Sequence, residues 1–262
     1  FTAKVYPYVL TGVGYNNAFA VCMDTATSVA SFWKTTTGGT TWSKVTGVLN
    51  SASSFADGVM FWDSGKGFCY GDPVSSEFEI YTTNDSGATW TAVPGTNIPD
   101  PAPASEYGYN GSYCTSIVSG GIGFFLTNAG RVFKTTDYGL TWSVTPAAPF
   151  TSIPATGKIY AADANYIIIA NFDTASSAYV WKYTANGGTT WQALTPTGSF
   201  YTYQMCYVPG TTNMFVSTSP DIQTATGVSY SNDGGLNWTD FADTILMNGL
   251  EKIQCLGVGF YN

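Results

Sequence analysis

Histidine is absent from this 262-residue chain, and arginine occurs once, as Arg131. The lack of histidine excludes Ser-His-Asp and Cys-His nucleophiles, histidine acid–base catalysis and imidazole-ligated metal sites. Charged residues make up 10% of the chain, against about 25% in an average domain, and the net charge is −8. Because phosphate backbones are bound by clustered cations, no nucleic-acid partner is expected.

Long apolar runs are also missing. No stretch approaches the ~18–20 apolar residues that cross a bilayer, so we expect a soluble chain without membrane insertion. The first residues, FTAKVYPYVL, lack the pattern of a signal peptide, so any export signal would already have been removed. With no D-x-D-x-D-G loop in the sequence, neither a metal nor another cofactor is predicted.

The cysteines show no C-x-x-C spacing, and their odd number excludes complete internal disulfide pairing. Four of the five lie in apolar, strand-like runs, which predicts buried free thiols. The five are Cys22, Cys69, Cys114, Cys206 and Cys255.

What the chain does contain is an octet that occurs five times. The clearest copies are TNDSGATW (83–90) and TTDYGLTW (135–142). Weaker copies are TTTGGTTW (35–42), TANGGTTW (184–191) and SNDGGLNW (231–238). Their tryptophans are spaced by 48, 52, 49 and 47 residues, and a near-constant period indicates one structural unit used repeatedly.

Each octet has the composition of a turn between two strands. An aspartate can accept hydrogen bonds from backbone N–H groups two or three residues on, glycine permits a positive φ, and tryptophan brings apolar area to the next strand. Thr37 replaces the aspartate in the first copy. We expect structural roles for Asp85, Gly87, Trp90, Asp137, Gly139, Trp142, Asn186, Gly188, Trp191, Asp233, Gly235 and Trp238.

These octets resemble the Asp-box, or BNR, repeat of sialidases, other glycoside hydrolases, sortilin-type receptors and photosystem assembly factors. The longer phrases GDPVSSEFEIYTTNDSGATW, EYGYNGSY, GRVFKTTDYGLTW and YVPGTTN are similar to those of secreted, type IX-sorted bacterial surface proteins. The resemblance covers roughly residues 10–262 through the repeat spacing. It implies a β-propeller that is secreted or displayed at the cell surface. The C-terminal sorting domain of such proteins is not recognisable in this sequence.

Each repeat of about 49 residues reads as four short strands. The second is the clearest, with GVMFW (58–62), FCYG (68–71), EFEIYTT (77–83) and TWTAV (89–93). The sequence therefore predicts an all-β fold, a single propeller over residues 1–262 with four-stranded antiparallel blades. We expect six blades, with five or seven as alternatives. The tail LEKIQCLGVGFYN and the N-terminal FTAKVYPYVL would close the ring.

Two kinds of hydrolase were weighed. The resemblance implies three arginines in a sialidase, and the single Arg131 excludes one. Other Asp-box hydrolases use two carboxylates roughly 5–10 Å apart. The candidates are Asp57, Asp63, Asp72, Glu77, Glu79, Glu106 and Asp163. None forms a recognisable motif, and Asp63, Asp72 and Asp163 are better explained as turn formers, so no catalytic residue is assigned.

Aromatic side chains offer the candidates for ligand binding, because rings stack on sugar faces. They are Trp62, Tyr107, Tyr109, Tyr113, Tyr201 and Tyr203, each with packing as the alternative. Three of these tyrosines lie in PGTNIPDPAPASEYGYNGSY (94–113), a predicted surface loop. Tyr201 and Tyr203 are expected side by side on one face of a strand.

The leading hypothesis is therefore a secreted or cell-surface propeller for recognition, adhesion or structure, which binds a glycan or another surface protein. The alternative is a glycoside hydrolase with a carboxylate pair in the propeller funnel, and a third hypothesis is a subunit of a larger extracellular assembly. The triplets DTA (24–26), DTA (173–175) and DTI (243–245) resemble a bacterial O-glycosylation signal. They predict modification of Thr25, Thr174 and Thr244.

Overall fold

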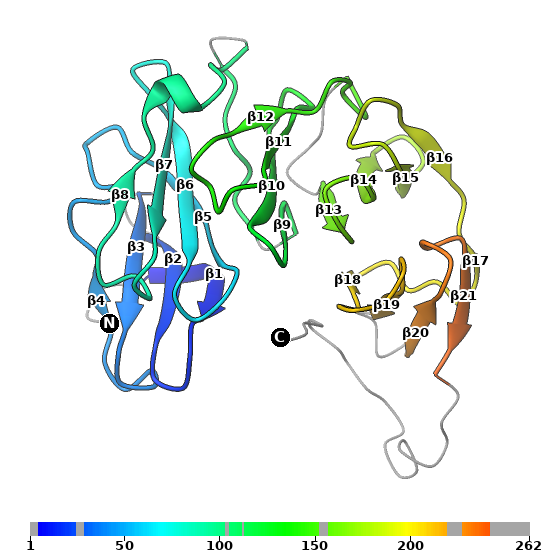
Figure 1. Ribbon diagram of the computed structural model, residues 1–262, viewed down its shortest axis with the longest axis horizontal. Helices are drawn as coiled ribbons and strands as arrows, with labels where there is room; N and C mark the ends of the chain where they lie inside the picture. The colour runs from blue at the N-terminus through cyan, green and yellow to red at the C-terminus, as the bar shows by residue number, and fades with distance from the viewer. Residues whose placement is uncertain are drawn as a thin grey trace. The chain divides into compact units, whose positions relative to one another are not determined.

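The computed structural model describes residues 5–24, 29–102, 105–111, 113–151, 157–218 and 227–241 (Figure 1). Within these ranges the chain forms β-sheets and no α-helix; the one helical segment is the 3-10 turn η1 (Gly95–Asn97). No helix in these ranges has the length and apolar character needed to cross a membrane. The chain divides into two compact units, Phe1–Ile159 and Tyr160–Asn262.

The first unit contains three sheets, each with its strands in chain order. Sheet one comprises β1 (Val5–Gly12), β2 (Ala18–Asp24), β3 (Ala30–Thr35) and β4 (Ser43–Lys44). Sheet two comprises β5 (Ala56–Phe61), β6 (Gly67–Val74), β7 (Glu77–Thr83) and β8 (Thr91–Ala92). Sheet three comprises β9 (Thr115–Val118), β10 (Ile122–Leu126), β11 (Val132–Thr135) and β12 (Ser143–Val144). The first strands β1 and β5 pack against one another, as do β5 and β9.

The other two sheets follow the same plan. One comprises β13 (Lys158–Ala161), β14 (Ile167–Asp173), β15 (Ala178–Thr184) and β16 (Gln192–Leu194). The other comprises β18 (Gln204–Tyr207), β19 (Phe215–Thr218), β20 (Val228–Ser231) and β21 (Asn237–Asp240). A short strand, β17 (Thr197–Gly198), is added to its outer edge, parallel to β21. This fifth strand was not predicted.

The predicted fold class is confirmed, because each sheet is built on four strands and each octet joins the third strand to the fourth. The single domain over 1–262 and the six blades stay predictions. The tail LEKIQCLGVGFYN (250–262) lies outside the described residues. Cys22, Cys69 and Cys114 are buried thiols outside any disulfide, Cys206 is a half-buried one, and Cys255 also lies outside the described residues.

In the octets the aspartate accepts from the backbone N–H three positions on, as predicted, and also from the residue four positions on. Asp137 Oδ1 accepts the Thr141 N–H at 2.9 Å and the Thr135 hydroxyl at 2.8 Å, while Oδ2 accepts the Thr141 hydroxyl at 2.6 Å. The Thr135 hydroxyl in turn accepts the Gly139 N–H at 3.0 Å. The buried hydroxyl two residues before the aspartate is therefore part of the turn, and the sequence reading had given it no role.

Glycine in the octet serves both the turn and the packing of neighbouring sheets. Gly87 has φ 73°, and a Cβ there would lie 2.2 Å from Cζ of Phe19 in β2. The Trp90 ring meets Phe19, Phe32 and Phe61 edge-on. The second octet thus fixes sheet two against sheet one.

Candidate functional site

Three strands in the first unit interrupt their pairing register at a polar residue. The register shifts between Pro7 and Val9 in β1, between Ala56 and Gly58 in β5, and between Gly71 and Pro73 in β6. The unpaired residues at these bulges are Tyr8, Asp57 and Asp72, which we call the bulge cluster. Bulges re-aim side chains and are common beside functional sites.

Hydrogen bonds connect the two carboxyl groups of the bulge cluster to each other and attach Tyr8 to the backbone beside Asp57. The Tyr8 hydroxyl donates to the Ala56 carbonyl, and the carboxyl groups of Asp57 and Asp72 hydrogen-bond to each other. The backbone N–H of Gly108 donates to the Asp72 carboxyl group. Because an ionised carboxylate only accepts, a bond between two carboxyl groups requires a proton on one of them.

Burial raises the pKa of Asp57 well above its usual range, and the neighbouring Asp72 charge and the bond to Asp72 raise it further. Burial also raises the pKa of Asp72, whereas its bonds with Asp57 and the Gly108 N–H lower it. Burial disfavours the ionised form, and Asp57 is the more deeply buried of the two carboxyl groups, so the proton of the pair belongs to Asp57. Asp57 is 1% exposed, and Asp72 is half-buried.

One oxygen of each carboxyl group has no further hydrogen-bond donor in the described ranges. Neither Oδ2 of Asp57 nor Oδ1 of Asp72 accepts a hydrogen bond from an amide or hydroxyl group in the described ranges. The described residues also contain no ion pair to either aspartate. Buried polar atoms are nearly always paired, so two such oxygens at one place single out the cluster.

Tyrosine and threonine side chains surround the cluster. The Tyr70 hydroxyl hydrogen-bonds to the carbonyl of Tyr109 at 2.7 Å and to the Thr115 hydroxyl at 2.9 Å. Its ring stacks on Phe125 with 4.5 Å between centroids. Burial raises the pKa of Tyr70 and of Tyr8, and in both the Asp57 charge adds to the shift.

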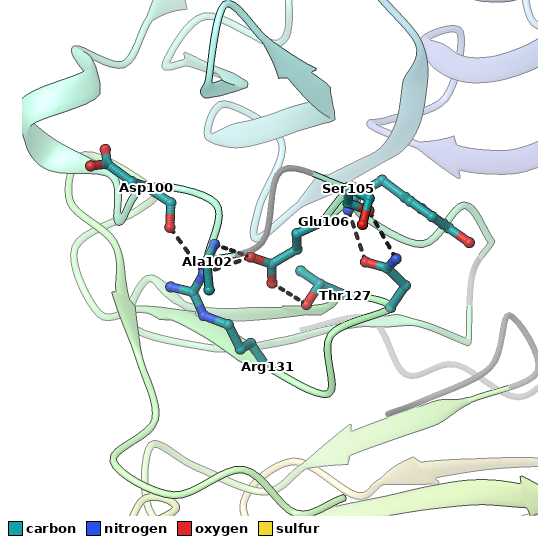
Figure 2. Close-up of polar contacts among 8 residues, drawn as sticks. Asp100, Ala102, Ser105, Glu106, Thr127 and Arg131 are labelled. Atoms are coloured by element: carbon teal, nitrogen blue, oxygen red, sulfur yellow. Dashed lines mark hydrogen bonds and ion pairs between the residues drawn. The ribbon is translucent and has the colours of Figure 1, made fainter. Parts of the chain in front are cut away.

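The long loop reaches the cluster because a buried ion pair holds it (Figure 2). Glu106 Oε2 accepts Arg131 Nη1 at 2.6 Å and the Ala102 N–H at 2.7 Å, and Thr127 Oγ1 donates to Oε1 at 2.5 Å. Arg131 Nη1 also donates to the Asp100 carbonyl at 2.9 Å. The Glu106 side chain is 0% exposed and that of Arg131 18%. We call this pair the loop clamp.

Asn128 extends the clamp along the loop. Its Oδ1 accepts the Tyr107 N–H at 2.9 Å, and its Nδ2 donates to the Ser105 carbonyl at 3.0 Å. Gly108 forms a β-bridge with Thr127, and a Cβ at Gly108 would lie 3.0 Å from Oδ2 of Asp57. Residues 105–109 are therefore fixed where the Gly108 N–H meets Asp72.

Several of the predicted ligand-binding aromatics have packing contacts. Trp62 Nε1 donates to the Ile122 carbonyl at 2.7 Å, and its ring packs on Phe68 and Tyr138. Tyr109 is 5% exposed, whereas its edge-on neighbour Tyr107 is 45% exposed. Of the loop tyrosines near the bulge cluster, Tyr107 is thus the one that faces solvent.

The remaining candidates lie elsewhere. The Lys158 ammonium is 5.4 Å from the ring centre of Tyr113, which is half-buried. Tyr201 and Tyr203 precede β18 instead of lying on a strand, because the strand begins at Gln204; this corrects the prediction for SFYTYQMCY. The ligand-binding roles of all six aromatics stay predictions.

Two of the three aspartates that were expected to form turns do so, and the third does not. Asp63 and Asp163 do form turns, each accepting two backbone N–H groups at 2.6–2.7 Å. Asp72 does not form the expected turn, because it lies within β6 at a bulge and pairs with Asp57. Proline in a strand indicates a bulge, so Pro73 was the signal in the sequence that could have located this feature.

The O-glycosylation triplets can be followed at one position. Thr174 is exposed in the turn after β14, where the Asp173 carboxylate accepts the Ala175 N–H and the Ser176 hydroxyl. Thr25 and Thr244 lie outside the described residues.

No protein-family model matches the chain. A xyloglucanase from a Paenibacillus species is 28% identical over 190 residues, which are 61% of this chain and 18% of that enzyme. The chain therefore spans about a fifth of the length of this relative.

Among solved structures, YCF48 bound to D1 peptide matches with a TM-score of 0.53 and 17% identity, over 92% of this chain and 83% of YCF48. The fold is a β-propeller of the BNR kind. The Hadza microbial sialidase Hz136 matches with a TM-score of 0.53 and 16% identity, over 88% of this chain and 57% of the sialidase. The GH74 enzyme of Niastella koreensis matches with a TM-score of 0.51 and 18% identity, over 90% of this chain and 38% of the enzyme.

Proposed function

We propose that this chain is a recognition propeller, secreted or displayed at the cell surface, that binds a surface protein or glycan beside the bulge cluster. The observation that carries the proposal is the bulge cluster itself. Three strands interrupt their regular pairing at a bulge, and these bulges bring together a tyrosine and two carboxyl groups. One oxygen of each carboxyl group has no amide or hydroxyl donor in the described residues. The exposed Tyr107 on the clamped loop adds an aromatic contact surface.

The separation of the carboxyl groups favours binding over hydrolysis. Glycosidases hold two carboxyl groups about 5–10 Å apart so that a sugar and a water fit between them. Asp57 and Asp72 instead hydrogen-bond directly to each other. The peptide bound to YCF48 supports a peptide as one kind of ligand, because this chain matches 83% of that protein.

The test is a binding screen of the purified chain on a peptide array and on a glycan array. We expect reproducible binding to one of the two arrays. The variants Tyr107→Ala and Asp72→Ala should weaken it at least about tenfold, which corresponds to one contact of about 1.4 kcal/mol. Tyr15→Ala is the matched control, because Tyr15 is 99% exposed and lies in the turn between β1 and β2. Equal loss in all three variants, or no binding on either array, would overturn the proposal.

A second candidate is a glycoside hydrolase, favoured by the 28% identity to a xyloglucanase. Under this hypothesis Asp57, held as a neutral acid, would protonate the leaving oxygen, and Asp72 would act as the carboxylate. The pair would have to separate when substrate enters. Incubation with xyloglucan should then release reducing ends, and Asp57→Asn should abolish the release. The hypothesis is rejected if the unaltered chain releases none.

A further inference from the structure

We propose that Asp57 and Asp72 form a proton-controlled latch, which is closed while Asp57 carries the shared proton and opens when that proton is lost. The latch joins the β5 bulge to the β6 bulge and to residues 105–109. It is a property of the free protein, so it does not depend on the binding proposed above.

The latch connects segments that are far apart in the chain. Asp57 belongs to β5, Asp72 to β6, and Gly108 to the clamped loop, and the Gly108 N–H and Asp57 both donate to the Asp72 carboxyl group. Tyr8 of β1 is attached next to it, through the Ala56 carbonyl. A change in the protonation of Asp57 therefore affects β1, β6 and the loop together.

The groups that face Asp57 are all acids, and the buried Lys158 of β13 acts on one of them, Cys114. The titratable groups that face Asp57 are Asp72 and Tyr70 from β6, Tyr8 from β1, and Cys114, which directly precedes β9. Cys22 of β2 faces Tyr8. Each of these groups is an acid, neutral when protonated and negative when ionised, so none supplies a positive charge. No ion pair to Asp57 is present in the described ranges.

Loss of the proton has two effects in the same direction. It removes the Asp57–Asp72 hydrogen bond, and it places a second negative charge beside an ionised Asp72 in a buried site. A Cβ built on Gly108 would lie 3.0 Å from Oδ2 of Asp57, so the loop backbone is directly beside the charge that forms. The ion pair of the loop clamp does not involve Asp57, so opening is expected at 107–109 and at the β5 bulge, with residues 100–102 and 105–106 still held.

The direction of the pH effect follows from the raised pKa. The folded chain binds the Asp57 proton more tightly than the unfolded chain does. The stability from the latch is therefore complete below the unfolded pKa of aspartate and is lost as pH rises through the folded pKa. The latch is closed in acid and opens towards alkaline pH.

The experiment is hydrogen–deuterium exchange of the whole chain between about pH 5 and pH 9, corrected for the intrinsic pH dependence of exchange. Above the titration point we expect exchange in peptides covering 55–61 and 105–111 to rise about tenfold per pH unit, because the open fraction grows with each unit. Asp57→Asn keeps a donor for Asp72 and cannot ionise, so its corrected exchange should stay flat. Asp63→Asn, in an exposed turn of the same sheet, should behave like the unaltered chain.

A measurement on the unaltered chain covers the case in which Asp57→Asn does not fold. Carboxyl-carbon NMR should show Asp57 titrating well above other aspartates. The latch is refuted if Asp57 titrates near pH 4, or if Asp57→Asn and the unaltered chain show the same pH dependence. Neither result bears on the array screen, so failure of the latch and failure of ligand binding can be told apart.

Discussion

At the scale of single residues, aspartate plays two opposite parts in this chain. In the octets it lies at the surface and accepts N–H and hydroxyl groups, which lower the pKa of Asp85 to about 2. In the bulge cluster Asp57 is buried beside another carboxyl group and stays an acid. The residue type is the same, and the number of donors and the burial decide its charge.

The first octet offers a gain of stability, because Thr37 stands where three other octets have aspartate. Its single Oγ1 must serve both the Thr41 N–H and the Thr41 hydroxyl, each at 2.9 Å. In Thr37→Asp two oxygens would share these donors, and we expect a gain of about 0.5–1 kcal/mol in the free energy of unfolding. Chemical denaturation measures it, with Thr36→Asp as the exposed neighbouring control. A stability at or below that of the control contradicts the prediction.

Two octet glycines separate backbone strain from steric overlap. Gly39 and Gly87 occupy the same octet position with φ 88° and 73°, yet a Cβ at Gly39 meets nothing within 4 Å, whereas one at Gly87 overlaps Phe19. Gly39→Ala should cost about 1 kcal/mol of unfolding free energy. Gly87→Ala should cost about 3 kcal/mol, since overpacking is added. Equal losses of unfolding free energy in the two variants would contradict the prediction, because Phe19 would then move away from the added methyl group without cost.

At the scale of elements, the loop clamp holds residues 100–102 and 105–109 against β10 and β11. Arg131→Ala leaves the fully buried Glu106 carboxylate without its cation, and we expect a loss of about 3 kcal/mol of unfolding free energy. Limited proteolysis should then cut within 98–111. Lys44→Ala, which removes an exposed charge at β4, is the control.

The double variant Glu106→Leu with Arg131→Met tests the reason for that loss. If the cost comes from an uncompensated buried charge, replacing both partners with apolar groups should recover much of the stability. No recovery would mean that the hydrogen bonds to Ala102 and Asp100 hold the loop, rather than the balance of charge.

Local elements could be predicted from the sequence, and assemblies of distant residues could not. The octets were recognisable because the turn residues and the tryptophan lie within eight positions and recur. The bulge cluster combines residues 8, 57, 72 and 108, and no local pattern joins them. Asp72 in YGDP fits a turn as well as a bulge, and only the pairing of β6 with β5 and β7 distinguishes the two. For the same reason no local pattern in the sequence joins Glu106 to Arg131.

At the scale of the whole molecule, the two kinds of aspartate act on folding stability at opposite ends of the pH range. Burial is the largest single effect on the pKa of Asp137 and Asp233 and raises it, but the hydrogen bonds together outweigh burial, so the pKa values of Asp85, Asp137 and Asp233 all lie below the usual value. Their stabilisation is present above the unfolded pKa and is lost as pH falls through the lowered values. Asp57 loses its contribution in the other direction, as pH rises.

The pH profile of the melting temperature should therefore have two limbs with a maximum at about pH 4–6, on the acidic side of neutrality. Asp137→Asn should flatten the acidic limb, because Asn186 already makes the corresponding hydrogen bonds in the fourth octet without titrating. Asp57→Asn should flatten the alkaline limb alone. Circular dichroism melts from about pH 2 to 9 measure both effects. A profile that rises continuously to neutral pH would contradict the retained proton on Asp57, because the octet carboxylates already contribute fully above the unfolded pKa of aspartate. The assignment of charge is also contradicted if Asp57→Asn flattens the acidic limb or Asp137→Asn flattens the alkaline limb.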